Sequence, residues 1–578
     1  MGVKNIFYLV MAVLLLTQCE PDEPSRNAVV HVKVSTDKAA YNLGEVVKFT
    51  LDKSPGSSFI VRYKHLGETI KEERITETSW TWNPPIADFK GYMVELLLPS
   101  QANEEVIAAI GVDVSSRWTK FPRYGFLSKF PQLSDQEISM VMDKLNRYHI
   151  NGIQFYDWHY KHHKPLAGTP ASPDAVYKDI INRDIYKATI DKYITSAHNL
   201  GMSAMFYNLA YGALKDASSD GVLEEWYVYT DNVHSVKDKH DLPEPPFVSD
   251  IFLTDPSHVA WQDYLADRND EVYSVFDFDG FHIDQLGDRG LKYAYDGTAF
   301  SLNSTFDSFI GSIKSRAPGK YMAFNAVNQY GQEAIASSPV DFLYTEVWSP
   351  NEAYADLATI IKSNNTLGNN TKNSVLAAYV NYDLATSPGF FNTPSVLMAN
   401  AVIFAFGGSH IELGEHMLGR EYFPNDNLKM RSDLQDQLTI YYDFLTAYEN
   451  ILRDGGTFNG PVVAAGDVKI NLNFWPPQTN QVSYLGKLVG NKQVVHLINF
   501  SDAATLQWRD NQGVQKDPGS TENFILNIES TSLVKKIWFA SPDLDYGASR
   551  QLPFTQSGNQ VSFVVPFLKY WDMIVIEW

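Results

Sequence analysis

The sequence predicts a multidomain protein in which a central (β/α)8 TIM barrel is flanked by an N-terminal immunoglobulin-like β-sandwich and a C-terminal β-sandwich. The chain has 578 residues, enough for about three or four domains of ordinary size. Short strands with alternating apolar residues occur near both ends, whereas short apolar strands alternate with helical segments in the middle. A doubly wound open sheet is the alternative for the middle, but Gly407-Gly408 is only a weak phosphate-binding signal.

Residues 1–18 are typical of a lipoprotein signal peptide, and residues 19–27 of an acidic tether. The apolar run at 6–16 is too short to span a bilayer, which takes about 20 residues. Leu16-Thr17-Gln18-Cys19 resembles a bacterial lipobox, in which Cys19 is lipidated, and the tether resembles the surface-export signal of Bacteroidetes lipoproteins. We therefore expect a surface-exposed protein anchored by lipid in the cell outer membrane. An ordinary secretory signal with an incidental cysteine is the alternative.

The composition narrows the classes of partner. Asp and Glu number 68 against 47 Lys and Arg, which gives a net charge of −21. Proteins that bind a phosphate backbone normally carry an excess of basic residues, so we expect no nucleic-acid partner. One cysteine excludes an internal disulfide and a multi-cysteine metal site. We expect a monomer.

The N-terminal β-sandwich is predicted at residues 28–116 and the C-terminal one at 457–578. Val47, Phe49 and Leu51 alternate with polar residues, as do the apolar residues at 30–34, and such short strands recur about every ten residues. Strand-like runs at 494–500, 534–538, 561–565 and 571–578 indicate a second small sandwich.

The barrel is predicted at residues 117–456. Ser134 and Glu137 have the spacing of a capping box, in which each side chain satisfies a backbone amide at a helix start. Eight strands are expected at 124–126, 153–158, 202–208, 280–284, 321–325, 342–346, 375–381 and 402–406. Helices are expected at 185–200, 259–276, 306–315, 353–363, 394–401 and 432–451.

Two strands of the predicted barrel end in carboxylates, Asp284 and Glu346. Alternate strands of a barrel contribute to one layer, and catalytic groups lie at the C-terminal strand ends. Two carboxylates across a barrel mouth are the apparatus of a glycoside hydrolase. Polar His282 and Gln285 can hold Asp284 ionised as a nucleophile, whereas the aromatic neighbours of Glu346 raise its pKa and suit a general acid. For either acid alone, a buried structural carboxylate is the alternative.

Other strand ends carry side chains that suit sugar hydroxyls and sugar faces. The candidate substrate-binding residues are Tyr156, Asp157, Trp158, Asn208, His282, Gln285, Asn325, Tyr344, Trp348, Asn381 and Glu412. A cluster of His410, Glu412 and His416 could instead bind a metal, but it lacks a tight His-Glu-x-x-His spacing. We expect no metal and no cofactor.

Four long stretches resemble glycoside hydrolase family 66, the dextranases and cycloisomaltooligosaccharide glucanotransferases. They lie at residues 123–128, 148–158, 280–287 and 344–348, and the order of domains is similar too. The resemblance implies that Asp284 is the nucleophile and Glu346 the acid/base of a retaining enzyme acting inside α-1,6-linked glucan. It further implies that dextran and isomalto-oligosaccharides are the ligands. The expected activity is that of an endo-dextranase.

Two further features bear on the activity. The cyclising members of the family carry a carbohydrate-binding module inserted late in the barrel. In this sequence, residues 381–401 leave no room for such a module. The absence of this room favours hydrolysis over cyclisation. The largest insertion, at 211–255, either walls the substrate cleft or forms a surface loop. The alternative functions are a non-catalytic glycan-binding surface lipoprotein and a retaining α-glycosidase or transglycosylase acting on another α-glucan.

Overall fold

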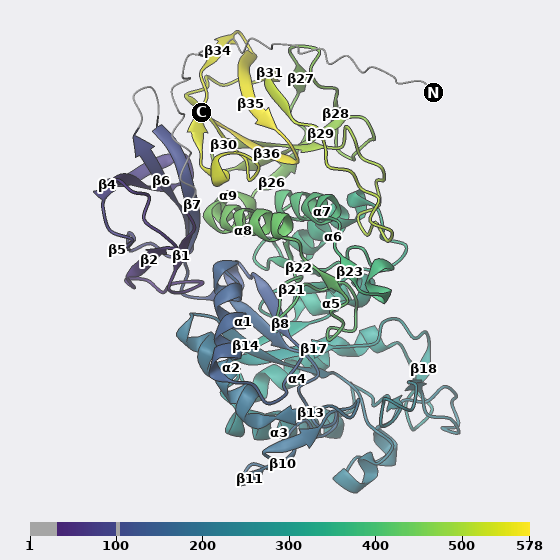
Figure 1. Ribbon diagram of the computed structural model, residues 1–578. Helices are drawn as coiled ribbons and strands as arrows, with labels where there is room; N and C mark the ends of the chain where they lie inside the picture. The colour runs from purple at the N-terminus through teal and green to yellow at the C-terminus, as the bar shows by residue number, and fades with distance from the viewer. Residues whose placement is uncertain (1–31, 100–103) are drawn as a thin grey trace, which may run out of the picture.

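The computed structural model describes residues 32–99 and 104–578 (Figure 1). The predicted signal peptide, Cys19 and the tether lie outside these residues. In the described part of the chain, no helix is both long and apolar enough to cross a membrane.

Two antiparallel sheets near the N-terminus enclose a common core. One sheet has the order β1 (Val34–Thr36), β2 (Val47–Leu51) and β5 (Ser79–Trp82); the other has the order β4 (Glu68–Ile75), β3 (Phe59–His65), β6 (Lys90–Pro99) and β7 (Glu104–Val114). Burial alternates along β2 as its sequence predicts. Phe49 and Trp80 stack in this core, and the Trp80 Nε1 donates to the Tyr63 hydroxyl at 3.0 Å.

The middle of the chain forms two parallel sheets that meet at both edges. The first has the order β20 (Tyr321–Phe324), β17 (Gly280–Asp284), β14 (Ser203–Leu209), β9 (Gly152–Phe155) and β8 (Tyr124–Leu127); the second has the order β21 (Leu343–Glu346), β22 (Ser374–Ala377) and β24 (Ser409–His410). Single parallel bridges pair Asn325 with Tyr344 and Phe126 with Gly414. The carboxyl ends of the strands therefore gather on one side.

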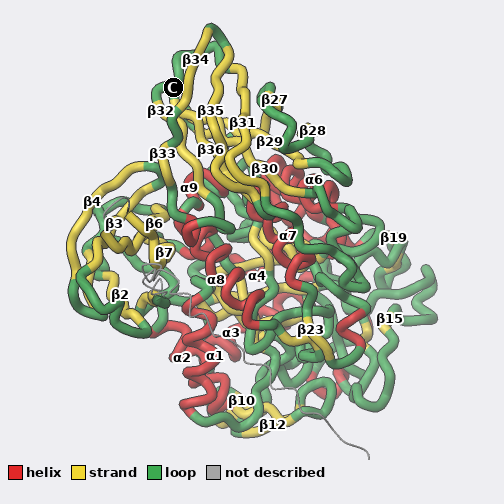
Figure 2. Tube along the Cα trace, turned by 45° about the horizontal axis from the view of Figure 1, so that its top comes forward, coloured by secondary structure: helices red, strands yellow, loops and turns green. Residues whose placement is uncertain are grey.

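Helices connect these strands and cover their outer faces (Figures 1 and 2). They are α1 (Asp135–Arg147), α2 (Lys187–Asn199), α3 (Val259–Val275), α4 (Phe306–Arg316), α5 (Gln332–Ser337), α6 (Tyr354–Leu367), α7 (Thr393–Ala405), α8 (Ser432–Ala447) and α9 (Glu449–Leu452). The capping box at α1 is confirmed: the Glu137 amide donates to Ser134 Oγ at 3.3 Å, and the Ser134 amide donates to Glu137 Oε2 at 2.8 Å.

The predicted strand at 402–406 is wrong, because these residues belong to α7 and to the residue that caps its C-terminus. Helix α7 is buried on all sides from Ser395 to Ala405, and a short apolar run of this kind cannot be assigned by its periodicity. The strand that follows it is β24. The strand predicted at 375–381 ends early at Ala377, so Asn381 lies in a loop with φ of 58°.

Short strands fill the connections of this region. They pair as β10 (Gly168–Thr169) with β11 (Ser172–Pro173), β12 (Val176–Lys178) with β13 (Asp184–Tyr186), β15 (Lys239–His240) with β16 (Ile251–Phe252), β18 (Lys292–Tyr293) with β19 (Ala299–Phe300), and β23 (Gly389–Phe390) with β25 (Leu428–Lys429).

Two further sheets near the C-terminus enclose a third core. One has the order β26 (Thr457–Asn459), β29 (Val482–Val489), β30 (Lys492–Asn499), β36 (Trp571–Glu577), β32 (Lys536–Ala540) and β33 (Arg550–Gln551), with β28 (Leu472–Phe474) beside β29; the other has the order β27 (Val463–Ala465), β31 (Thr521–Glu529), β35 (Gln560–Leu568) and β34 (Phe554–Ser557). In Figure 1 these strands lie above α7, α8 and α9.

A buried arginine joins the N-terminal sheets to the middle region. The Arg123 guanidinium donates to Asp113 on β7 at 2.7 Å and to Glu449 on α9 at 3.1 Å, while its Nε donates to the His149 carbonyl oxygen at 2.6 Å. The side chains of Arg123, Asp113 and Glu449 are fully shielded from solvent. These contacts tie β7 and α9 to the loop before β8.

Candidate active site

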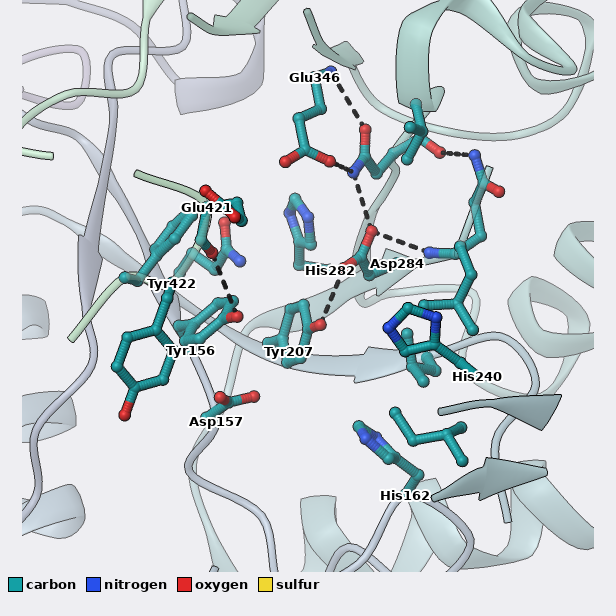
Figure 3. A pocket seen from close by; sticks show the side chains of 18 of the residues that line it. Tyr156, Asp157, His162, Tyr207, His240, His282, Asp284, Glu346, Glu421 and Tyr422 are labelled. Atoms are coloured by element: carbon teal, nitrogen blue, oxygen red, sulfur yellow. Dashed lines mark hydrogen bonds between the residues drawn. The ribbon is translucent and has the colours of Figure 1, made fainter. Parts of the chain in front are cut away.

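A cavity of about 420 Å³ opens at the carboxyl ends of the parallel strands (Figure 3). Asp284 and Glu346 both line it. The strands place them there because Asp284 is the last residue of β17 and Glu346 the last of β21. The prediction that two strand-end carboxylates meet in one cavity therefore matches the geometry.

Three donors surround the Asp284 carboxylate. The Tyr207 hydroxyl on β14 donates to Oδ2 at 2.8 Å, while the Asn325 amide and the Gln285 backbone N–H each donate to Oδ1 at 2.8 Å. We expected the side chains of His282 and Gln285 to hold this carboxylate. Instead, the His282 ring lies beside Tyr124 and Tyr344.

The Gln285 side chain is directed to other backbone groups. Its Oε1 accepts from the Gly287 amide at 2.6 Å, and its Nε2 donates to the Asn325 carbonyl oxygen at 3.2 Å. The expectation for Gln285 thus fails for the side chain, although its backbone N–H does bind Asp284.

Tyrosine and asparagine side chains hold Glu346. The Tyr379 hydroxyl donates to Oε1 at 2.6 Å, and Asn325 Nδ2 donates to Oε2 at 3.2 Å. In return, the Glu346 backbone N–H donates to Asn325 Oδ1 at 3.2 Å. Glu346 is thereby fixed from β21, from the end of β20 and from the segment after β22.

The amide nitrogen of Asn325 connects the two carboxylates, because it donates to both Asp284 and Glu346. The bonds are 2.8 and 3.2 Å long and meet at one nitrogen. The two accepting oxygens therefore lie within about 6 Å, and roughly 5 Å apart where the bonds follow the two N–H directions of a planar amide.

Burial dominates the electrostatics of this pair. It raises the pKa of Asp284, against the effect of the donors Asn325 and Tyr207. Burial, together with the charge of Asp284, raises the pKa of Glu346 to about 7, against the donors Tyr379 and Asn325. Glu346 is thus protonated below about pH 7, which suits a general acid.

Most of the other predicted residues also line the cavity. They are Tyr156, Asp157, His282, Gln285, Asn325, Tyr344 and Trp348. The Asp157 carboxyl, whose pKa burial raises to about 7, lies near Tyr156 and Tyr207 in Figure 3. Asp157 has φ of 49°, a backbone conformation that is uncommon for residues other than glycine.

Four predicted residues are buried but are not among the described residues that line the cavity: Trp158, Asn208, Asn381 and Glu412. Trp158 donates to the Tyr207 carbonyl oxygen at 3.1 Å and packs in the core. Asn381 donates to the Asp510 carbonyl oxygen at 2.8 Å. Because strands β9 and β22 end earlier than predicted, the side chains of Trp158 and Asn381 were assigned to the wrong places.

The side chains of the remaining two are engaged in hydrogen bonds within the fold. Asn208 donates to the His162 carbonyl oxygen at 2.8 Å. Glu412 accepts from the Asn400 amide at 2.7 Å and from the Tyr442 hydroxyl at 3.0 Å. These contacts are typical of buried polar groups that are satisfied within a fold.

Several cavity residues were not predicted. Tyr207 and Tyr379 bind the two carboxylates, and a signal for them existed: each lies one or two positions before an asparagine at which the sequence predicts the end of a strand. The loop after β24 contributes Glu421, Tyr422 and Phe423. The insertion at 211–255 contributes His240, Leu242, Phe247 and Ile251, so this insertion does wall the cavity.

Within the described residues, one group has the spacing of metal ligands: His163, Asp216 and Asp220. The Lys161 ammonium already lies between the two carboxylates, at 2.6 Å from Asp216 and 2.8 Å from Asp220. The ring of His410 is bound to the Asn400 side chain and the Ala378 carbonyl oxygen. The carboxylate oxygens of Asp216 and Asp220 and the ring nitrogens of His410, which could bind a metal, are therefore engaged in contacts within the protein.

Comparison with known proteins gives consistent matches over nearly the whole chain. The model of glycosyl hydrolase family 66 matches residues 36–575. A cycloisomaltooligosaccharide glucanotransferase of Niallia circulans is 27% identical over 100% of this chain and 76% of its own length. A dextranase of Streptococcus salivarius is 23% identical over 88% of this chain and 70% of its own length.

One solved structure has a closely similar fold. It is a cycloisomaltooligosaccharide glucanotransferase of Paenibacillus sp., complexed with cycloisomaltoheptaose, with a TM-score of 0.86 and 24% sequence identity. The match covers 94% of this chain and 99% of the other. The similarity at this level of identity concerns the multidomain, β-rich fold.

Proposed function

The chain belongs to glycosyl hydrolase family 66, and on that premise we propose that it is an endo-acting, retaining dextranase. It cleaves α-1,6-glucosidic linkages of dextran and releases isomalto-oligosaccharides. Asp284 acts as the nucleophile and Glu346 as the acid/base. Support for the substrate comes from the relatives, which are named for dextran and for cyclic isomaltooligosaccharides.

One observation carries the proposed mechanism: a single amide, that of Asn325, bonds both carboxylates. The oxygens that it joins lie roughly 5 Å apart, near the spacing of about 5–5.5 Å in retaining glycosidases and below the range of about 6.5–9.5 Å in inverting ones. A water molecule does not fit between the sugar and a nucleophile at this spacing, so direct attack by Asp284 is favoured.

The reaction proceeds in two displacements. Asp284 attacks the anomeric carbon while Glu346 gives its proton to the departing glycosidic oxygen, so the C–O bond breaks and a glycosyl ester forms. Glu346, now ionised, takes a proton from water, whose oxygen attacks the same carbon and releases Asp284. Two inversions leave the α configuration unchanged. Tyr207 and Asn325 donate to the Asp284 carboxylate throughout.

Transfer to a sugar hydroxyl in place of water is the second candidate, favoured by relatives that are named glucanotransferases. The alignment with one of them spans 743 residues against the 578 of this chain, so that relative carries additional residues within the aligned region. Here α7 begins at Thr393, shortly after β22 ends at Ala377, which leaves no room for a module between them. We therefore favour hydrolysis.

The finer architecture belongs to the same proposal. The bridges Asn325–Tyr344 and Phe126–Gly414 support one closed (β/α)8 barrel, flanked by an immunoglobulin-like sandwich and a second sandwich. The domain boundaries that we propose are 28–116, 117–456 and 457–578. An experimental structure with an open gap at either bridge would contradict the barrel.

We also propose that the protein is a monomer anchored in the outer membrane through lipidated Cys19. Labelling of cells with a radioactive fatty acid should mark the protein and not its Cys19→Ser variant. Equal labelling of both would rule out this anchor.

The function is tested by incubating the protein with dextran and, separately, with starch, then sizing the products. Isomalto-oligosaccharides from dextran alone are expected. Asp284→Asn and Glu346→Gln should each reduce the rate at least about 10³-fold, because each removes one member of a cooperating pair, while dextran binding persists. Full activity in either variant, or cleavage of starch alone, would contradict the proposal. Binding without cleavage by the wild type would favour a glycan-binding role.

A further inference from the structure

The loop between β30 and β31, residues 500–520, brings the C-terminal sheets against the strand ends beside the cavity. The Trp508 amide donates to the Glu352 carbonyl oxygen at 2.9 Å, and its indole Nε1 donates to the Asn351 carbonyl oxygen at 2.8 Å. The Asn381 backbone N–H donates to the Arg509 carbonyl oxygen at 2.7 Å. This loop is therefore attached to the segments that follow both β21 and β22.

Arg509 lies directly behind the cavity wall and is only 4% exposed. Its Nη2 donates at 2.7 Å to the carbonyl oxygen of Val347, the residue between Glu346 and Trp348. Its guanidinium carbon lies 5.1 Å from the ring centre of Trp348 and 4.6 Å from that of Trp508. The guanidinium thus contacts the backbone and the ring that follow Glu346.

The charge of Arg509 is also near Glu346. Burial lowers the pKa of Arg509, and the groups that oppose this effect are Glu352, Tyr379, Tyr382 and Glu346. Asp284 at the end of β17 and the Tyr379 hydroxyl in the segment after β22 also act on Glu346. A buried cation behind Glu346 favours the ionised form of this carboxyl.

We infer that Arg509 is a positioning residue of the active site: it fixes the Val347 carbonyl and the Trp348 ring, and through them the acid/base Glu346. This inference rests on the proposed function. It gives the loop between β30 and β31 a role in supporting the active site, although none of the described residues that line the cavity comes from this loop or from the C-terminal sheets. The competing view is that Arg509 only stabilises the contact between regions.

The chain offers a matched control, a second buried cation between the C-terminal region and the middle region. Lys487 on β29 is 3% exposed and donates to the carbonyl oxygens of Leu452 at 2.9 Å and Ile451 at 3.3 Å. It is a buried cation that joins the C-terminal sheet to α9, away from the cavity. Lys487→Met should lower thermal stability while changing kcat and KM less than about twofold.

Arg509→Met should lower stability too, and in addition lower kcat/KM on dextran about tenfold or more, because misplacement by about 1 Å is costly. The alkaline limb of its pH–rate profile should move to higher pH by roughly half a unit, since a cation near Glu346 is lost. Arg509→Lys, which keeps the charge, should leave that limb in place while KM rises.

These outcomes separate the two proposals. If Arg509→Met loses stability but keeps the wild-type kcat, KM and pH profile, as Lys487→Met does, the positioning role is refuted and the dextranase proposal stands. If Arg509→Met does not fold, Arg509→Lys decides: wild-type kinetics would refute the positioning role. If the wild type cleaves no dextran, both proposals fail together.

Discussion

The surroundings of the Glu346 carboxyl raise its pKa and so favour its neutral form at acidic pH. Burial and the neighbouring Asp284 outweigh the Tyr379 and Asn325 donors, so its pKa rises to about 7. Catalysis by the proposed mechanism needs Glu346 protonated and Asp284 ionised in the same molecule. The two groups therefore limit the reaction from opposite sides of the pH scale.

We expect a bell-shaped dependence of kcat/KM on pH. As pH rises through about 7, Glu346 loses its proton and the rate falls; as pH falls, Asp284, whose pKa is also raised, gains a proton and the rate falls again. The measurement is initial rates on dextran between pH 3 and 10. The control is the Glu346→Gln variant, assayed with a glucoside whose leaving group departs without protonation. In this assay the alkaline limb of the pH profile should disappear. A rate that still rises above about pH 9 would contradict this assignment.

At the residue scale, the sequence predicts the two carboxylates better than their partners. Asp284 and Glu346 could be placed because alternation along a strand shows which residue is its last inward one. The partners depend on the register between strands, which puts Tyr207 opposite His282 and leaves its hydroxyl next to Asp284. The sequence of a single strand does not predict its register with the neighbouring strand.

At the scale of elements, the closure between β8 and the segment after β24 depends on one glycine. A Cβ on Gly414 would lie 2.3 Å from the Phe126 carbonyl oxygen and 2.8 Å from its ring. A backbone atom cannot move away as a flexible side chain can, so the two segments would have to separate. Gly311 in α4 is the opposite case, because a Cβ there has nothing within 4 Å.

Gly414→Ala should therefore destabilise the protein by about 2 kcal/mol or more. Gly311→Ala should stabilise it by about 0.5–1 kcal/mol, since alanine loses less conformational entropy than glycine in a helix interior. Thermal unfolding of both variants against the wild type measures the difference. Equal melting temperatures for Gly414→Ala and the wild type would mean that the space between Gly414 and Phe126 can hold a methyl group.

Element prediction succeeds where local signals are strong and fails in long apolar runs. The strand at 280–284 has the predicted bounds, and α3 and α4 differ from prediction by one residue. The run at 402–406 was assigned to a strand because α7 is apolar on every face and so has no helical periodicity. Only its burial between the parallel strands and the C-terminal sheet explains such a helix.

At the scale of the whole molecule, the three regions are joined by buried polar contacts. Arg123 holds Asp113 of the N-terminal sheet and Glu449 of α9. Lys33 and Asp436 also join the N-terminal region to α8, at 2.9 Å, but their side chains are 76% and 60% exposed. The buried Arg123 contacts and the exposed Lys33–Asp436 pair thus link similar parts of the molecule in opposite surroundings.

Arg123→Met should lower the free energy of unfolding by about 3–5 kcal/mol, because Asp113 and Glu449 lose the buried guanidinium that donates to both of them. Lys33→Ala should lower it by less than about 1 kcal/mol, since water screens an exposed pair. Urea unfolding followed by tryptophan fluorescence compares them. Similar midpoints for the two variants would show that the buried contact is not what joins the regions.

The sequence predicts that three kinds of region exist but not how they touch. Arg123 stands in a stretch that resembles the family, yet its partners are 10 and 326 positions away along the chain. Arg509 and Trp348 are likewise far apart in sequence. Such contacts depend on how whole sheets and helices pack together. The local periodicity of one sequence does not predict that packing.

The amide of Asn325 has one more consequence, for chemical ageing. Both hydrogens of its Nδ2 are engaged by the carboxylates, so spontaneous deamidation would remove both bonds at once. The aspartate left behind would place a further carboxylate between the two acids and remove their shared donor. Hydrolysis of this one amide, which takes up one water molecule and releases one ammonia with almost no change in mass, would thus inactivate a stored preparation while the rest of the fold stayed intact.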